Sequence, residues 1–219
     1  MDTCILVPIK TKNKRLPGKT FRLLNGKPLY TYLFKTLKDL KNDGLEIYID
    51  SSDKKVLSIS RECGFNVFVR PEEYNQDYIT GDELIARNID KLNYEIIGLL
   101  HITSPFLTLK TIKKAISIIE ENKHLDSLFG VVPRYNRFWY QNKPINHNPN
   151  KLTRTQDLVP IYEEADFYFF RKKSFKKYGK RVCGNFQTIE VNKIEAVDID
   201  YLEDLLYAEA LIKGGLVQI

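Results

Sequence analysis

The sequence predicts an α/β fold in which a mostly parallel β-sheet carries helices on both faces. Short, continuous apolar runs alternate along the chain with segments of roughly 10–15 residues whose apolar residues recur at helical spacing. Continuous apolar runs are typical of strands that are buried on both faces of a parallel sheet. Such sheets bind ligands beyond the carboxyl ends of their strands, so candidate functional residues are expected there.

The first part of the chain shows this alternation most regularly. In chain order, strands are expected at residues 4–9, 45–50, 66–70, 95–102 and 127–132. The helices between them are expected at residues 28–41, 56–63, 84–92 and 109–119. In the first of these helices, leucines at positions 29, 33, 37 and 40 share one face, which predicts burial against the sheet.

The pattern breaks over residues 134–165, which are rich in Asn, Pro, Arg and aromatic residues and have no helical period. We expect an irregular or hairpin insertion, and long insertions usually carry function or an interface. Trp139 and Tyr140 would be buried there, either between subunits or in an internal core. The alternation resumes with strands at 167–170 and 186–191 and a last helix at 201–213. The 219 residues show no repeat and no linker, which predicts a single domain over 1–219.

Composition excludes several classes of protein. No apolar run approaches the ~20 residues that a membrane-spanning helix needs. The N-terminus runs directly into a strand-like segment, which argues against a secretory signal. Cys4, Cys63 and Cys183 are far apart and odd in number, which excludes a disulfide framework and a CxxC zinc site. This use of cysteine indicates a reducing cytoplasm.

The charge of the chain is positive, with 34 Lys and Arg against 28 Asp and Glu. Much of the excess lies between residues 10 and 27, and the chain has no zinc-finger spacing, no RRM aromatic motif and no basic heptad region. A local cluster after a buried strand favours a small polyanion, such as a nucleoside triphosphate, over nucleic acid. A solvated lysine surface is the alternative.

A cationic loop follows the first strand, with the sequence VPIKTKNKRLPGKT at residues 7–20. Lys10, Lys14 and Lys19 supply the charge that a triphosphate needs, and Pro17-Gly18 sets a turn that would aim Lys19 inward. The loop is neither a Walker loop nor a dinucleotide fingerprint, because both need further glycines. From the residues alone, phosphate binding and a solvated loop are equally open.

Asp198 and Asp200 end an extended run just before the last helix. Residues two apart in extended backbone face the same side, so the two carboxylates would form part of a magnesium site that phosphates and water complete. The alternative is structural, because Asp200 and Glu203 also have the spacing of a capping box.

Two further clusters carry weaker signals. LHITSP, at residues 100–105, closes the strongest predicted strand and is also an ordinary helix-entry turn. RTQDLVPIY, at 154–162, lies in the insertion. There, Arg154 would either bind a carboxylate of a ligand or form an internal salt bridge with Asp157.

These blocks, in this order, resemble the acylneuraminate cytidylyltransferase family, the CMP-sialic acid synthetases, to which the CMP-Kdo synthetases are related. The motifs that carry the resemblance are VPIKTKNKRLPGKT, Gly26-Lys27-Pro28-Leu29, Arg70-Pro71, LHITSP, RTQDLVPIY, and Asp198-Ile-Asp200 followed by Asp204, Ala208 and Glu209. They span nearly the whole chain. The first and last blocks are the most specific.

The resemblance implies a Rossmann-like sheet of the nucleotide-diphospho-sugar transferase type and a magnesium-dependent reaction. The anomeric hydroxyl of an acidic sugar, sialic acid or a related nonulosonate, would attack the α-phosphate of CTP, giving the CMP-sugar and pyrophosphate. It further implies a cytoplasmic homodimer formed through residues 134–165, without nucleic-acid or membrane partners. CMP-sugars of this kind usually feed surface polysaccharides or glycoproteins.

Roles for individual residues follow from the resemblance in the same way. Lys19 and Asp200 would be catalytic, and Asp198 and Asp200 would bind Mg²⁺. The nucleotide would be held by Lys10, Asn13, Lys14 and Lys19 at the triphosphate and by Thr20 and Arg70 near the cytidine. The sugar would be bound by His101, Thr103, Ser104, Arg154, Gln156 and Tyr162, with Arg154 on its carboxylate.

The sequence departs from the family pattern at several of these positions. Lys10 replaces an Arg, and Thr20 replaces an Asn that would read the base, which leaves selectivity for CTP over UTP open. His101 replaces a Gln, and Ala165-Asp166 stands where Asn-Gly is expected, so the identity of the sugar is open as well. Kdo or another acidic acceptor is one alternative. A glycosyltransferase with a related sheet is another, because such enzymes also carry a strand-end aspartate pair.

Overall fold

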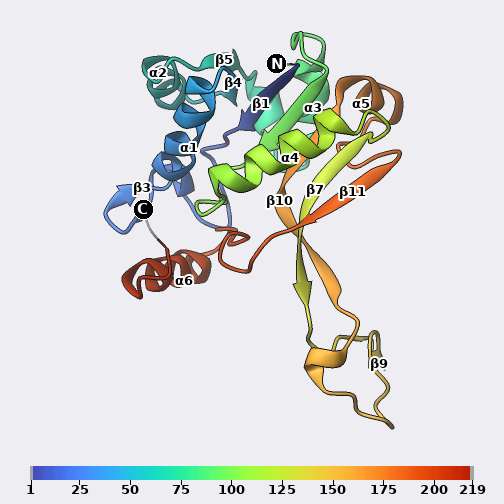
Figure 1. Ribbon diagram of the computed structural model, residues 1–219. Helices are drawn as coiled ribbons and strands as arrows, with labels where there is room; N and C mark the ends of the chain where they lie inside the picture. Colours follow the sequence, from blue (N-terminus) through green and yellow to red (C-terminus); the bar gives the residue numbers. More distant parts are fainter. Residues whose placement is uncertain (1, 218–219) are drawn as a thin grey trace.

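The computed structural model of the chain describes residues 2–217. Seven strands form one sheet in the order β11-β7-β10-β6-β1-β4-β5 (Figure 1). The strands are β1 (Thr3–Pro8), β4 (Glu46–Ser51), β5 (Asn66–Val69), β6 (Ile96–Leu100), β7 (Ser127–Arg134), β10 (Ile161–Arg171) and β11 (Phe186–Glu190). Only β10 runs antiparallel to both of its neighbours, and the other pairs are parallel. The predicted mostly parallel α/β class is therefore confirmed.

Helices cover both faces of this sheet. They are α1 (Tyr30–Asn42), α2 (Lys54–Glu62), α3 (Gly81–Ile89), α4 (Leu109–Glu121), α5 (Lys172–Tyr178) and α6 (Leu202–Lys213). Apolar residues of α1, α2 and α4 pack with Ile5 and Val7 of β1, and those of α3 and α5 pack with Cys4 and Leu6. Alternate residues of β1 thus face opposite layers, because side chains in a strand alternate between its two sides.

The elements expected from the sequence agree with the structure to within a few residues, but the structure also contains elements that were not expected. The short helix α5 was not expected. Residues 161–165, assigned to the insertion, instead begin β10. β10 pairs with β7 from Ile161 onward, so these two strands continue as a ribbon beyond the sheet (Figure 1).

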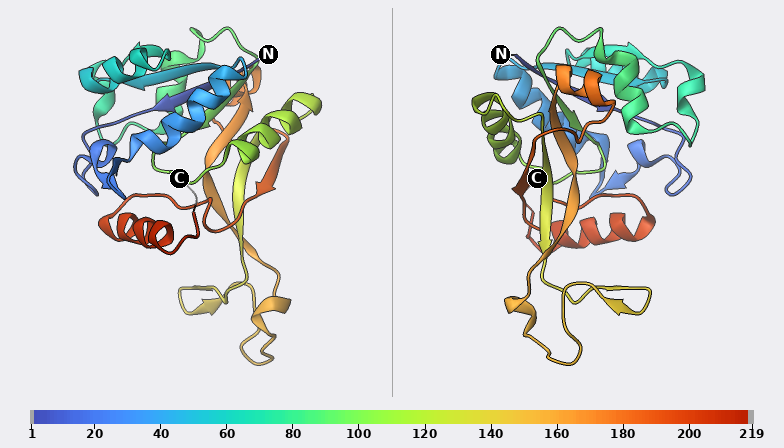
Figure 2. Two further views of the ribbon diagram at one scale, coloured as in Figure 1. Left: turned by 60° about the vertical axis from the view of Figure 1, so that its left-hand side comes forward. Right: turned by 90° about the vertical axis from the view of Figure 1, so that its right-hand side faces the viewer.

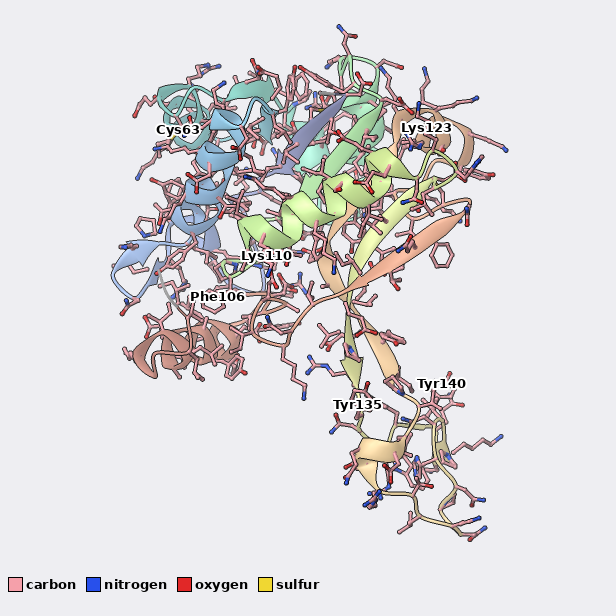
Figure 3. The ribbon with its side chains drawn as sticks, viewed as in Figure 1. Cys63, Phe106, Lys110, Lys123, Tyr135 and Tyr140 are labelled. Atoms are coloured by element: carbon pink, nitrogen blue, oxygen red, sulfur yellow. The ribbon has the colours of Figure 1, made fainter. Side chains whose placement is uncertain are left out.

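The ribbon ends in an arm, defined here as residues 135–160, that projects away from the rest of the molecule (Figure 2). The arm holds a small hairpin of β8 (Trp139–Tyr140) and β9 (Lys143–Pro144) and a 3-10 turn, η3 (Thr155–Asp157). Trp139 and Tyr140 are 55% and 65% exposed, so their expected burial in an internal core is wrong. Figure 3 shows the side chains of Tyr135 and Tyr140 on this part of the chain.

A β-bulge lies in β10 between Ala165 and Tyr168, where the register against β7 shifts. A Cβ on Gly130 of β7 would come within 2.1 Å of the ring of Phe167, so only glycine leaves room for this ring. Bulges often lie beside active sites, where they redirect a side chain. This one lies at Asp166, close to the carboxyl end of β6.

The segment before α6 is extended, as expected, but it does not join the sheet. It is held by one backbone bond, in which the Ile199 N–H donates to the Thr103 carbonyl at 2.8 Å. Val197 and Ile199 are buried in a third apolar cluster with α6, while Asp198 and Asp200 alternate with them and are only partly buried. The two carboxylates therefore share the outward side, as the period of two predicts.

Within residues 2–217, no helix combines the length and apolar character that crossing a lipid bilayer requires.

Candidate active site

A pocket of about 350 Å³ lies at the carboxyl ends of β1 and β6. It is lined by Pro8, Lys10, Asn13, Arg15, Lys19, His101, Ile102, Thr103, Asp166, Asp198 and Asp200. We call it the first pocket. A further pocket of about 640 Å³, the second pocket, shares Asp166, Asp198 and Asp200 with it. Four separate stretches of sequence thus meet at one edge of the sheet.

The loop after β1 places its cations by local structure. Gly18 adopts a left-handed conformation with φ of 70°, and a 3-10 turn, η1 (Lys19–Phe21), follows it. This turn directs Lys19 inward, as the Pro-Gly pair predicted, and its side chain is only 6% exposed. The Asn13 side-chain amide donates to the Lys10 carbonyl at 2.7 Å, which closes the loop on itself.

Asp200 is the anion that meets these cations. One carboxylate oxygen lies 2.7 Å from Lys19 Nζ, and the other lies 2.6 Å from an Arg15 guanidinium nitrogen. The expected capping box of Asp200 and Glu203 is wrong, because Asp204 accepts the backbone N–H groups of Asp200 and Tyr201 at 2.9 and 2.7 Å. The Asp200 side chain therefore faces the pocket.

The Asp198 carboxylate has fewer compensating contacts than the Asp200 carboxylate. Its Oδ1 atom is buried and has no hydrogen-bond partner among the residues that the structure describes. Burial raises the pKa of Asp198 to about 6, the Asp166 and Asp200 charges add to this, and a hydrogen bond from Thr103 opposes it. An unpartnered carboxylate oxygen beside a second carboxylate is a favourable place for a cation.

The two aspartates fit a magnesium ion by their chemistry. Mg²⁺ is commonly bound by one or two carboxylates, with substrate phosphates and water completing the shell. Across residues 2–217, no three His, Cys, Asp or Glu side chains are grouped as a metal cluster. The protein would thus supply two ligands and leave the others to substrate and water.

Of the residues predicted for the sugar, the structure brings His101 and Thr103 to the first pocket, while Ser104, next to them in sequence, is 5% exposed. Sequence reasoning missed Asp166, which lines both pockets. Its Oδ1 lies 3.7 Å from His101 Nε2. The sequence did show Ala165-Asp166 in place of the Asn-Gly pair of the family pattern. The direction of the Asp166 carboxylate, however, depends on the bulge in β10.

Thr20 and Arg70, predicted near the cytidine, line neither pocket. Thr20 is buried, with its hydroxyl within 3.5 Å of the Lys10 carbonyl. Arg70 is buried against Asp50, donating from Nε to a carboxylate oxygen at 3.1 Å and from Nη2 to the backbone carbonyl at 2.7 Å. Arg87 donates to the other Asp50 oxygen at 2.5 Å. Burial lowers the pKa of Arg70, although the Asp50 charge opposes this.

Three further predicted sugar ligands line neither pocket. Arg154 lies on the arm and pairs with Asp157 at 2.6 Å, which is the internal salt bridge that the sequence left open. Gln156 belongs to the same 3-10 turn. The Tyr162 hydroxyl donates to Glu190 at 3.0 Å.

An acidic segment after β5 faces the cationic loop, and nothing in the sequence pattern indicated this. Asp77 accepts from Lys10 Nζ at 2.7 Å and from Lys14 Nζ at 2.6 Å. These lysines lower the pKa of Asp77 to about 2 by hydrogen bonding and by charge, so it is ionised at all ordinary pH values. Glu72 pairs in the same way with Lys12, at 2.5 Å.

Comparison with known proteins identifies the family and the fold of the chain. Residues 4–217 match the protein family described as cytidylyltransferase. The chain is 24% identical to a pseudaminic acid cytidylyltransferase of Campylobacter jejuni, over 97% of each sequence. It is 32% identical to a CMP-N,N'-diacetyllegionaminic acid synthase of Legionella pneumophila, also over 97% of each. A solved CMP:2-keto-3-deoxy-manno-octonic acid synthetase complexed with CTP shares the fold, with a TM-score of 0.73 and 16% identity over 97% of this chain and 99% of that one.

Proposed function

The chain belongs to the cytidylyltransferase family and transfers the cytidylyl group of CTP to an acidic sugar, and we propose that the acceptor is sialic acid or a related nonulosonate. We further propose that the reaction depends on Mg²⁺ and that the enzyme works as a homodimer. The observation that carries this proposal is the 2.7 Å contact between Lys19 and Asp200, which joins a cationic loop and a carboxylate pair in one pocket.

In this proposal the triphosphate lies along the cationic loop. Lys10, Asn13 and Lys19 line the first pocket, whereas Lys14 does not line it and, with a side chain that is 85% exposed, shares Asp77 with Lys10. The nearly buried ammonium group of Lys19 stabilises the charge that develops as pyrophosphate leaves, since such a donor acts more strongly in a site that excludes water. The buried Thr20 does not reach the nucleotide in this proposal; its hydroxyl, within 3.5 Å of the Lys10 carbonyl, supports the loop.

Asp198 and Asp200 would hold the metal. When bound, Mg²⁺ supplies charge neutralisation and orients the reacting oxygens. In the structure Asp200 neutralises Lys19 and Arg15, so binding of a metal and a triphosphate would exchange these contacts for carboxylate–metal and ammonium–phosphate contacts. Asp198 then gains a partner for its buried oxygen.

In this proposal the acidic sugar occupies the second pocket, whose lining holds two cations among six carboxylates. Its volume of about 640 Å³ is in the range of small-molecule sites. Two cations line it, Arg134, which also contacts Glu163, and Lys193, which has no carboxylate partner within the described part of the chain. Either could receive the sugar carboxylate. The pocket lies beside the shared aspartates, so a sugar there would present its hydroxyl toward the α-phosphate.

The homodimer explains the position of the arm. Arg154 lines neither pocket of its own chain, and the arm exposes Tyr135, Trp139 and Tyr140 by 45%, 55% and 65%. Aromatic residues are enriched at protein interfaces. A second copy that packs on the arm would cover these residues, and the arm would bring Arg154 to the sugar site of that copy.

The acceptor could also be Kdo, because the solved synthetase with a TM-score of 0.73 is named for that acid. The match of residues 4–217 to the cytidylyltransferase family argues against the alternative of a glycosyltransferase. The cytoplasmic location stays a prediction.

The proposal is tested by incubating the purified enzyme with CTP, Mg²⁺ and a panel of acids that contains sialic, legionaminic and pseudaminic acids and Kdo. We expect pyrophosphate and a CMP-sugar with at least one nonulosonate, and no pyrophosphate without an acceptor. Turnover confined to Kdo would make that acid the acceptor. An absence of turnover with every acid would contradict the proposal.

A further inference from the structure

The Asp77 carboxylate forms ion pairs with two lysines of the cationic loop at the same time. Asp77 Oδ1 contacts Lys10 Nζ at 2.7 Å, and Asp77 Oδ2 contacts Lys14 Nζ at 2.6 Å. Each carboxylate oxygen thus accepts from one ammonium group. The two non-bridging oxygens of a phosphate could bind the same two ammonium groups in the same way. Asp77 follows η2 (Glu72–Asn75), on a segment that precedes α3 and belongs to neither pocket.

We propose that Asp77 is an internal competitor of the CTP phosphates, which holds Lys10 and Lys14 in the free enzyme and releases them when the nucleotide binds. Asp77 is then a positioning residue that acts through these lysines and sets the affinity for CTP. This inference rests on the proposed function, because it requires that the two lysines bind the triphosphate.

The exposure of the partners makes the exchange feasible. The Lys10, Asp77 and Lys14 side chains are 26%, 48% and 85% exposed. Ion pairs with this much solvent access are weak, so they can be broken without disturbing the fold. A triphosphate carries more charge than one carboxylate and offers several oxygens, so it displaces Asp77 from both lysines.

Asp77 also has an effect before CTP arrives. It holds the two ammonium groups on one anion, which offsets their mutual repulsion. The same contact lowers the positive potential at the mouth of the pocket and weakens the attraction of a polyanion. Its removal should therefore strengthen nucleotide binding and leave the chemical step unchanged.

The chain offers a matched control in Glu72. This residue lies on the same acidic segment and pairs at 2.5 Å with Lys12, whose side chain is 77% exposed and lines neither pocket. Glu72→Gln and Asp77→Asn each remove one negative charge from this segment, and a glutamine oxygen at position 72 can still accept from the Asn75 side-chain amide, which contacts Glu72 at 3.0 Å. If the two variants differ in their affinity for CTP, the difference is due to the contact of Asp77 with Lys10 and Lys14. If both change the affinity equally, the effect is due to long-range charge.

The experiment measures the dissociation constant of CTP by calorimetry, and KM and kcat by pyrophosphate release. We expect Asp77→Asn to lower both the dissociation constant and KM about two- to five-fold, with kcat unchanged and the melting temperature close to that of the parent. Glu72→Gln should stay near the parent value. The gain should shrink at about 0.5 M NaCl, where exposed charges are screened. Lys14→Ala should remove part of the gain when it is combined with Asp77→Asn.

Unchanged or weaker CTP binding in Asp77→Asn would overturn the inference, and so would an equal gain in Glu72→Gln. Lys10→Ala and Lys14→Ala separate this failure from a failure of the proposed function. If they weaken CTP binding while Asp77→Asn does not strengthen it, only the role of Asp77 is wrong. If neither lysine matters for CTP, the proposed nucleotide site is wrong as well.

Discussion

Lys19 Nζ lies 2.7 Å from an Asp200 carboxylate oxygen, although 181 positions separate the two residues in the chain. The lysine follows β1, and the aspartate precedes α6. They meet because the 197–200 segment is tied to Thr103 at the end of β6, which pairs with β1. This contact places the cationic loop and the carboxylate pair in a single pocket.

Replacing Asp200 with Asn should abolish most of the activity and also destabilise the protein. The substitution removes a metal ligand and leaves the nearly buried Lys19 ammonium group without its counter-charge. We expect kcat to fall by at least about 100-fold and the free energy of unfolding to fall by about 1–3 kcal/mol. Arg15→Ala removes the 55% exposed partner and should cost under about 1 kcal/mol. Steady-state kinetics and urea unfolding measure both, and near-normal turnover in Asp200→Asn would contradict the assignment.

Replacing Asp198 with Asn should stabilise the metal-free protein at neutral pH while it removes activity. The pKa of Asp198 is raised to about 6 in the folded state, from an ordinary value of 3.8. The folded protein therefore binds more protons than the unfolded chain between these values, and its stability falls as pH rises through this window. Above about pH 7 the ionised carboxylate costs on the order of 1–3 kcal/mol, which Asn avoids.

Thermal unfolding in EDTA at about pH 4 and about pH 8 provides the measurement. We expect Asp198→Asn to unfold at a higher temperature than the parent at the higher pH and to show little difference at the lower pH. Addition of Mg²⁺ should stabilise the parent and not the variant. A variant that is less stable than the parent at the higher pH would show that the ionised carboxylate is well compensated.

Arg154→Ala should be inactive alone, and mixing it with Asp200→Asn subunits should restore part of the activity. If Arg154 serves the site of the partner subunit, a mixed dimer of the two inactive variants contains one intact site. Random reassociation should then restore about a quarter of the parent activity, because half of the dimers are mixed and each has one working site. Activity of mixtures refolded at equal concentration measures this, with each variant refolded alone as the control. An inactive Arg154→Ala that shows no recovery on mixing would place Arg154 in the site of its own subunit, and full activity of Arg154→Ala alone would place it outside both sites.

Arg70→Lys should lower stability more than it lowers the affinity for CTP. The guanidinium group donates to both the side chain and the backbone of buried Asp50, and lysine cannot reproduce this forked geometry. We expect a loss of about 2–4 kcal/mol in unfolding free energy with a change in KM for CTP below about three-fold. A large rise in KM with unchanged stability would instead support the direct contact with cytidine that the family resemblance implies.

The parts of this structure that follow a local period were predictable. The apolar runs around Ile5, Ile47 and Ile97 specify buried strands, and the carboxyl-edge rule for parallel sheets then locates the cationic loop and LHITSP together. Asp198 and Asp200 share a side because extended backbone has a period of two, whether or not it joins a sheet.

What could not be predicted depends on contacts between distant segments. The position of Asp166 requires the antiparallel pairing of β10 and its bulge, neither of which leaves a mark in the Ala165-Asp166 pair. The contact of Asp77 with Lys10 spans 67 positions between polar side chains and follows no pattern. Arg70-Pro71 marks the end of β5, but the burial of Arg70 depends on Asp50 in the neighbouring strand β4.

The most direct measurement follows the phosphorus resonances of CTP during incubation with Mg²⁺ and the acid panel, with Lys19→Ala as the control enzyme. We expect the three CTP signals to give way to one phosphodiester signal of a CMP-sugar and one pyrophosphate signal of twice its intensity, because pyrophosphate holds two equivalent phosphorus atoms, and only when an acceptor is present. Lys19→Ala should slow this conversion by at least about 100-fold. Hydrolysis of CTP without a phosphodiester product, or full activity in Lys19→Ala, would contradict the account.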